Sequence, residues 1–332
     1  MATADAEDAL RFLGRAENAT SPEILTLLWN ETQRLARTYG DQLTWLVDDL
    51  IVARKAIFRL LDSPAPPSQT RDLYFLGGII CSMLAHTGRD LGSLDTSLMY
   101  QNTALLCAER AGHPGLHIVV RTEQAASAYW MGRYSESIRY AQLAANEAAR
   151  VRGSIAVLPV VQEARAWAAI GNAELTRAAL NRGRDIRERV TLDDLDEIGG
   201  MMRFSLPEQL GIVAGTAAWL PDAAEAEQAA SEAVAAMTNA APANRSFNSE
   251  AIARADLALA RVRQRALDGA HDAVRPILQV PADRRVLPIR ASVLRLHHAL
   301  ADPVFHGSPA ARDIAAEIEV FCQHPNPAQL PE

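Results

Sequence analysis

The chain has 332 residues and a formal net charge of −7, and hydrophobic residues make up 49% of it while aromatic residues make up only 5%. An acidic protein of this kind is poorly suited to wide, non-specific contact with phosphate backbones, and no apolar run in it reaches the length of a membrane span. The scarcity of aromatic residues and the abundance of alanine favour closely packed helices over a β-sandwich. The sequence therefore predicts an all-α protein.

The N-terminal residues, MATADAEDAL, are acidic and contain no hydrophobic segment of the secretory type. We therefore expect a cytoplasmic protein that does not contact a membrane. The three cysteines, Cys81, Cys107 and Cys322, lie inside helical patterns and have no paired spacing. In a reducing compartment such residues are most simply buried thiols, neither disulfide partners nor metal ligands.

Residues 1–19 are polar and alanine-rich, and we expect them to form a partly ordered lead-in. A helix pair is predicted over residues 20–62. Its first helix starts at Thr20-Ser21-Pro22-Glu23, where a hydroxyl cap, a proline in the first turn and an acid near the positive end of the helix dipole occur together. The proline-rich residues 63–68 (SPAPPS) must end the second helix.

The clearest structural unit in the sequence is a helical hairpin over residues 119–150. Its first half repeats apolar residues at three- and four-residue intervals, Gly132 interrupts this pattern, and a second apolar stripe follows. The unit resembles one tetratricopeptide repeat (TPR). Gly92 and Gly171 stand at equivalent places, 40 residues before and 39 residues after Gly132.

A single helical hairpin leaves apolar flanks that only similar neighbours can cover. We therefore expect residues 69–324 to form a right-handed superhelical solenoid of TPR-like antiparallel helix pairs, with residues 325–332 as a non-helical tail. Later pairs are predicted near residues 207–219 and 222–239, 247–264 and 267–279, and 284–301 and 308–322. In the pair that starts at residue 247, Arg265 takes the place of the turn glycine.

Between residues 191 and 206 the helical pattern lapses into TLDDLDEIGGMMRFSL. We predict a long loop here, with the acidic residues forming a solvated turn. A calcium site is disfavoured, because the run has no glycine at the sixth position and no ligand at the twelfth.

Six phrases, spread along the chain in one order, carry a family resemblance. They are QTRDLYFLGGIICSMLAHTGRDLG at 69–92, AERAGHPGL at 108–116, SAYWMGRYSESIRYAQ at 127–142, EARAWAAIGNAE at 163–174, LDDLDEIGG at 192–200 and SFNSEAIARADLALAR at 246–261. Together they resemble the TPR-type region of actinobacterial transcriptional regulators of the XRE helix-turn-helix class. The resemblance implies a role in regulating transcription.

In that family a small DNA-binding domain precedes the repeats. Here no basic, DNA-reading helix can be placed before Thr20. We therefore expect contact with DNA only through a helix-turn-helix domain that is absent from this chain.

In a superhelix of helix pairs, the first helix of each pair forms most of the concave inner wall. Counting back from the turn glycines, we expect seven polar or aromatic residues on that wall, at places where alanine would be enough for structure alone. They suit an aromatic floor surrounded by hydrogen-bonding groups, and we predict that they bind a ligand. The seven are Ser82, His86, Arg89, Thr122, Tyr129, Trp130 and Arg165.

These residues also have structural explanations. Tyr129 and Trp130 stand next to a turn, where aromatic residues often serve in packing. His86 fits equally a surface histidine or a core histidine with satisfied hydrogen bonds. Arg165 fits an ion pair with Glu163 or with an acid on the next helix.

Motifs for catalysis and for metal binding are largely missing. There is no glycine-rich phosphate loop, no GxSxG and no HExxH, and the single lysine, Lys55, stands in no phosphate-binding motif. His297 and His298 are adjacent, so on a helix they point about 100 degrees apart. His113 and His117 have the spacing of metal ligands, but a proline and a glycine lie between them. We predict no catalytic residues, no bound metal and no cofactor.

The sequence thus predicts a sensory or protein-interaction module of a transcriptional regulator, whose concave surface binds a small molecule or a peptide effector. The alternative is a stand-alone scaffold that binds another protein or forms a homodimer. A third hypothesis, an enzyme built on the same helical solenoid, has no set of acid, base and nucleophile behind it. We therefore expect no enzymatic activity.

Overall fold

A computed structural model describes residues 22–39, 43–241 and 245–323 of the chain. Helical turns account for 82% of these residues and no strand occurs among them, so the expected all-α class is confirmed. The expected lead-in at 1–19 and the tail at 325–332 lie outside the described residues. In the described part, no helix is both long enough and apolar enough to cross a membrane.

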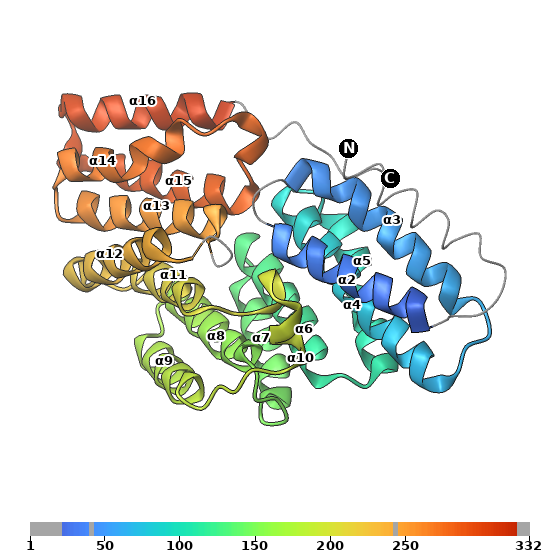
Figure 1. The fold of residues 1–332 in the computed structure, drawn as a ribbon. Helices are drawn as coiled ribbons and strands as arrows, with labels where there is room; N and C mark the ends of the chain where they lie inside the picture. The colour runs from blue at the N-terminus through green and yellow to red at the C-terminus, as the bar shows by residue number, and fades with distance from the viewer. Residues whose placement is uncertain (1–21, 40–42, 242–244, 324–332) are drawn as a thin grey trace.

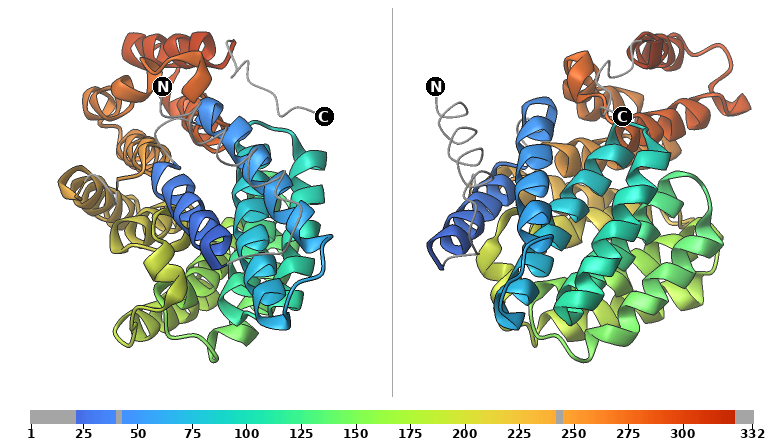
Figure 2. Two further views of the ribbon diagram at one scale, coloured as in Figure 1. Left: turned by 45° about the vertical axis from the view of Figure 1, so that its right-hand side comes forward. Right: turned by 90° about the vertical axis from the view of Figure 1, so that its right-hand side faces the viewer.

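Most helices form antiparallel pairs that follow one another along the chain (Figures 1 and 2). The first helices of the pairs are α2 (Pro22–Thr38), α4 (Pro67–Asp90), α6 (Pro114–Trp130), α8 (Leu158–Ala169), α11 (Leu206–Ala217), α13 (Phe247–Arg263) and α15 (Leu287–Leu300). The second helices are α3 (Leu43–Leu61), α5 (Leu94–Ala111), α7 (Tyr134–Ala148), α9 (Ala173–Arg187), α12 (Ala223–Asn239), α14 (Leu267–Leu278) and α16 (Pro309–Gln323). The pairs after residue 206 lie within a few residues of their predicted bounds.

Short helical segments lie in the connections between pairs and, for η5, in the connection within the last pair. They are α10 (Asp194–Ile198) and the 3-10 turns η1 (Ser154–Val157), η2 (Gly200–Met202), η4 (Ala282–Arg284) and η5 (Pro303–Phe305).

The first helices form a continuous inner layer, since each packs on the first helix of the next pair all the way from α2 to α15. Figure 1 shows the path of the chain from α2 to α5 at the right, through α6 to α10 below, to α11 to α16 at the upper left. The path bends far enough for α15 to contact α4 and α6. Packing between sequential neighbours is what a helical repeat requires.

The turns inside the pairs follow the predicted chemistry. Gly92, Gly132 and Gly171 have φ values of 80°, 75° and 80°, in the left-handed region that ends many helices. Arg265, which takes the place of a glycine in the α13–α14 turn, adopts the same conformation at a φ of 64°. A side chain in this region costs backbone strain, so the turn geometry is imposed by the packing of the two helices.

Two groups of buried apolar side chains hold the layers together. The first core is formed by α2 to α8 and the segment that ends at Phe204, and it contains most of the largest fully buried side chains, such as Leu76, Ile79 and Leu84. The second core is formed by α11 to α16. Alanine supplies 11 of its 27 residues but only 8 of the 37 residues in the first core. Helices in the second core therefore approach each other closely over small side chains.

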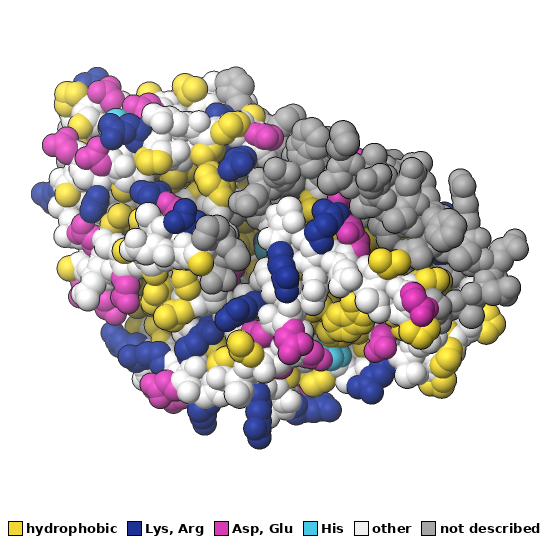
Figure 3. Space-filling model, in the orientation of Figure 1, with side chains coloured by type: hydrophobic (Ala, Val, Ile, Leu, Met, Phe, Trp, Pro, Cys, Tyr) yellow, Lys and Arg dark blue, Asp and Glu magenta, His cyan; other side chains and the backbone are white. Residues whose placement is uncertain are grey.

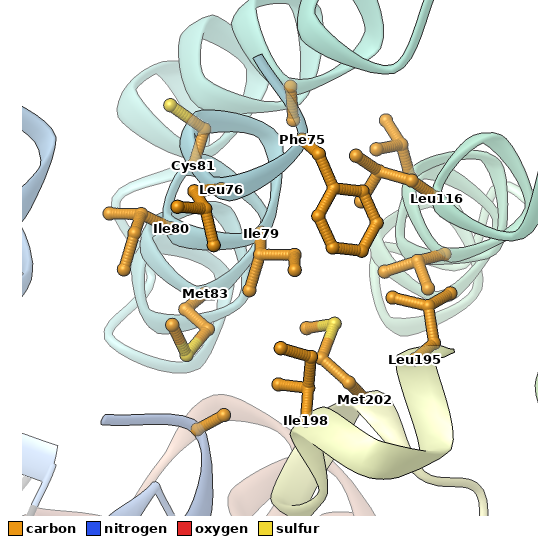
Figure 4. Packing of buried hydrophobic residues seen from close by; sticks show 14 of the residues in the cluster. Phe75, Leu76, Ile79, Ile80, Cys81, Met83, Leu116, Leu195, Ile198 and Met202 are labelled. Atoms are coloured by element: carbon orange, nitrogen blue, oxygen red, sulfur yellow. The ribbon is translucent and has the colours of Figure 1, made fainter. Parts of the chain in front are cut away.

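The structure of residues 191–206 differs from the long loop that the sequence predicts. It contains α10 and η2, and Leu195, Ile198 and Met202 are fully buried. Figure 4 shows these three side chains pointing toward Phe75 and Ile79 of α4, inside the first core. The segment is thus a part of the core and not a solvated turn.

The acidic residues of this segment are used structurally. Asp193 caps α10 in a capping box with Asp196. The buried Asp196 carboxylate also accepts hydrogen bonds from the backbone N–H and the hydroxyl of Ser154, 42 residues away. Arg37 of α2 then donates to the carbonyl oxygens of Glu197 and Ile198, at 3.0 and 3.2 Å. These bonds tie the segment to two other parts of the inner layer.

Candidate functional site

A cavity of about 270 Å³ lies where the inner helices come together. The lining residues come from first helices or from the segments next to them, and among the described residues no second helix contributes. On the face seen in Figure 3, arginine side chains lie over the middle of the molecule, between α2 and the helices α11 to α13. The polar, charged and aromatic residues of the wall include Arg37, His86, Arg89, Asp90, Thr122, Glu123, Trp130, Gln162, Arg165, Arg203, Glu208, Arg245 and Asn248.

The helical period explains why these residues share one wall. On α6, Val119, Glu123, Ala126 and Trp130 follow one another at three- or four-residue intervals, so all of them face the cavity. On α8, Leu158, Gln162 and Arg165 do the same. Each inner helix thus presents one stripe that combines apolar and polar side chains.

A compact ion network forms the wall on the side of α4 and α6. Arg89 lies between Glu123, at 2.8 Å, and Asp90, at 2.8 Å. The His86 Nδ1 atom lies 3.0 Å from the other oxygen of Glu123. Asn248 of α13 donates to Asp90 across the cavity, at 3.3 Å. Arg89, Asp90 and Glu123 are all buried, so the network is held by its mutual pairing.

The network shifts the ionisation of its members. Burial opposes ionisation of Glu123, but Arg89 and His86 overcome this effect and hold the pKa of its carboxyl below the ordinary value. Burial alone would lower the pKa of Arg89, but Glu123 and Asp90 raise it above its ordinary value. The pair Arg89 and Glu123 therefore stays charged.

Arg165 lies in a different environment. Only 7% of it is exposed, and its guanidinium carbon lies 4.2 Å from the ring centroid of Tyr129 and 5.1 Å from that of Trp130. One nitrogen donates to Gln162 at 2.6 Å, while the buried Nε has no partner. Burial lowers the pKa of Arg165 to about 10. The aromatic faces are thus its main electrostatic support.

The aromatic floor beneath Arg165 reaches into the second half of the chain. Trp219, just after α11, donates its indole N–H to the Tyr129 hydroxyl at 2.8 Å. Arg295 of α15 lies over the Trp219 ring and forms an ion pair with the buried Asp256 of α13. The aromatic side chains of the cavity floor therefore contact helices that belong to both cores.

The structure gathers five of the seven predicted wall residues around this cavity: His86, Arg89, Thr122, Trp130 and Arg165. Tyr129 does not line it but lies buried behind Trp130 and Arg165. Ser82 does not line it either: this residue is buried, and its hydroxyl donates to the Gly78 carbonyl one turn earlier in α4.

Other wall residues were missed in the sequence. Glu123 and Gln162 have the correct helical spacing to Trp130 and Arg165, and that spacing could have identified them. Glu208 and Asn248 could not have been found this way, because the bend that brings α11 and α13 against α4 and α6 leaves no local signal. Arg165 was expected to pair with Glu163 or an acid on the next helix, and it pairs with neither. Glu163 instead binds Arg182, at 2.6 Å.

His113, which has the spacing of a metal ligand with His117, lies away from the cavity and has a structural role. His113 caps α6 by accepting a hydrogen bond from the backbone N–H of Leu116, and its other ring nitrogen lies 2.9 Å from Asp194. Within the described ranges, no group of three or more His, Cys, Asp or Glu side chains is placed to hold a metal ion.

Comparison with known proteins leaves the family open. No protein-family model matches the chain, and no curated protein matches it significantly.

Proposed function

We propose that the chain is a TPR-like, right-handed superhelical module of a transcriptional regulator, and that it binds a small-molecule or peptide effector in the cavity of the inner layer. The observation that carries this proposal is the composition of the wall. Charged, aromatic and apolar side chains from the first helices of all seven pairs converge on one cavity. The sequence phrases that resemble XRE-class regulators supply the regulatory context, with DNA contacted through a separate helix-turn-helix domain.

The cavity is suited to coupling binding with a change in helix arrangement. Its walls belong to both cores, and single hydrogen bonds such as Asn248 to Asp90, at 3.3 Å, and Trp219 to Tyr129, at 2.8 Å, connect the two sides. A ligand that contacts both sides would favour one relative position of the two halves. It would act by its differential affinity for that arrangement.

Binding fits the wall better than catalysis does. The acid and base groups of the network are committed to each other: His86 and Arg89 both contact Glu123. No serine, threonine or cysteine nucleophile is bonded to His86 among the described residues. A group that serves as general base must be free to accept a proton from a substrate.

The test is to purify the full chain from its source without refolding and to look for a retained mass by native mass spectrometry. A thermal-shift titration with extract of the same organism follows. We expect a bound compound or an upward shift that Trp130→Ala abolishes. Trp167→Ala is the matched control, because Trp167 is on α8 but does not line the cavity.

The scaffold alternative gives a different result in the same experiment. A stoichiometric protein partner, or a second copy of the chain, would be retained without any small compound. The proposal would be abandoned if extract produced neither a shift nor a bound mass and Trp130→Ala left the regulatory output unchanged.

A further inference from the structure

The charge of the cavity wall is opposite to that of the whole protein. The chain as a whole is acidic, with a formal charge of −7. Five arginines line the cavity, against three carboxylates. Since field lines are concentrated in a cavity with low-dielectric walls, this local excess selects the sign of a ligand.

The excess positive charge is unpaired. Among the cavity arginines, only Arg89 forms ion pairs with carboxylates of the described chain. Arg37 and Arg245 donate to backbone carbonyl oxygens, and Arg203 is exposed at the rim. Arg165 donates only to a side-chain amide.

The wall carboxylates do not cancel this charge. Asp90 and Glu123 are taken up by Arg89 and His86. Glu208 accepts from the backbone N–H and the hydroxyl of Ser205, both at 2.9 Å, and burial raises the pKa of its carboxyl. An anion in the cavity would therefore meet little repulsion.

Arg165 is the arginine built to receive such an anion. Its Nη2 donates to Gln162 and its Nε is enclosed without a partner, which leaves Nη1 without a hydrogen bond in the described chain, and a charged donor left unsatisfied is costly. Its plane is fixed by the rings of Tyr129 and Trp130 and by Gln162. A guanidinium held in this way is preorganised to donate a charged hydrogen bond to an oxygen of a carboxylate or phosphate.

The rest of the wall defines the body of the ligand. Apolar side chains line the cavity beside the charged ones, among them Ile155, Leu158, Phe204 and Ile212. A cavity of about 270 Å³ lies near the lower end of the range for ligand pockets. It therefore suits a small molecule better than an extended peptide.

We propose that the cavity binds a small organic anion, a carboxylate or a phosphate on an apolar body, whose charged group pairs with Arg165. This inference rests on the proposed function and narrows its effector to one chemical class. The arginines at the rim, Arg37, Arg203 and Arg245, steer the anion inward, while the apolar wall holds its body.

The test uses three related probes on the full chain: benzoate, phenyl phosphate and the uncharged benzamide. Binding is measured by isothermal titration calorimetry at millimolar probe concentration and constant ionic strength. We expect at least one anion to bind about tenfold or more tightly than benzamide, as charged hydrogen bonds would provide. The better of the two anions identifies carboxylate or phosphate as the natural charged group.

Arg165→Met is the decisive variant. Because it replaces a buried arginine that forms no ion pair by an apolar side chain of similar length, and the nearby Asp256 keeps its ion pair with Arg295, it should fold with a melting temperature close to or above that of the wild type. It should also lose the preference for anions. Arg150→Met is the control, since it removes the same charge from an exposed position that pairs only with Glu147.

Three outcomes would overturn the inference: no binding of either anion, equal binding of benzamide, or an anion preference that survives in Arg165→Met. Retention of an uncharged compound in native mass spectrometry would reject the anion and leave the proposed effector function intact. Loss of the extract-dependent shift in both Trp130→Ala and Trp167→Ala would instead count against the proposed function.

Discussion

The two cores of this protein stabilise helix pairs in different ways. In the first core, large side chains such as Leu76, Ile79 and Leu84 interlock, and the segment containing α10 and η2 adds three more from outside the pairs. In the second core, small side chains such as Ala230, Ala255 and Ala258 allow the helices to approach closely. The first arrangement is stabilised mainly by the amount of apolar surface that it buries, and the second by close van der Waals contact between its helices. The cavity lies between a half whose core is built from large side chains and a half whose core is rich in alanine.

Matched isoleucines give the largest effect and the most direct test of this difference. Ile79 and Ile289 are both fully buried, one in each core. We expect Ile79→Ala to lower the free energy of unfolding by about 4 kcal/mol and Ile289→Ala by about 2 to 3 kcal/mol, because neighbours fill a cavity more easily where side chains are small. Chemical denaturation of both variants provides the measurement. Equal losses would show that the two cores do not differ in the proposed way.

The second largest effect on stability is expected in the ion network of Arg89, Asp90, Glu123 and His86, on the cavity wall of the first half. Glu123→Gln leaves Arg89 without its main partner, and we expect a loss of about 3 kcal/mol at neutral pH. The pKa of Glu123 is lowered in the folded protein, so its contribution is present above the unfolded pKa and disappears as the pH falls through the folded value. The difference between wild type and variant should therefore shrink below about pH 4. Denaturation curves recorded from pH 7 to pH 3 provide the measurement, and a difference that stayed constant with pH would show that the loss does not come from the charge of Glu123.

The smallest effect concerns how the segment 191–206 joins the first core. A Cβ atom on Gly200 would meet the Ala36 carbonyl far inside van der Waals contact, and its φ is 54°. Gly200→Ala should cost about 2 kcal/mol, since backbone must move as well as adopt strain. Gly132→Ala is the control: its φ is 75°, but nothing lies within 4 Å of the added atom. Thermal unfolding should show roughly 1 kcal/mol or less for this control. If both variants lost the same amount, docking on α2 would not be the cause.

The helical pattern allowed the pairs and their turns to be predicted from the sequence. Apolar residues at three- and four-residue intervals and a glycine at each turn are local signals, and the turns at Gly92, Gly132 and Gly171 were found where they were expected. The same period placed His86, Arg89, Thr122, Trp130 and Arg165 on the inner side of their helices.

What the sequence missed depends on contacts between distant residues. In the sequence, Asp196 looked like a member of a solvated acidic run. In the structure it is buried, and its carboxylate accepts hydrogen bonds from Ser154. Nothing near Asp90 in the sequence indicates that Asn248 reaches it from α13. Such pairs arise only when the chain bends back on itself, and no local periodicity encodes that bend.

The thiols provide a natural reporter of the contrast between the halves. Cys81 and Cys107 are buried near the first core, and burial raises the pKa of both, that of Cys107 to about 11. Cys322 is half-buried against the second core, where burial also raises its pKa. Since only an exposed thiolate reacts with iodoacetamide, alkylation followed over time would record the opening of each region separately within one molecule. No engineered label is needed, because the chain already carries native cysteines on both sides of the cavity whose alkylation rates can be followed.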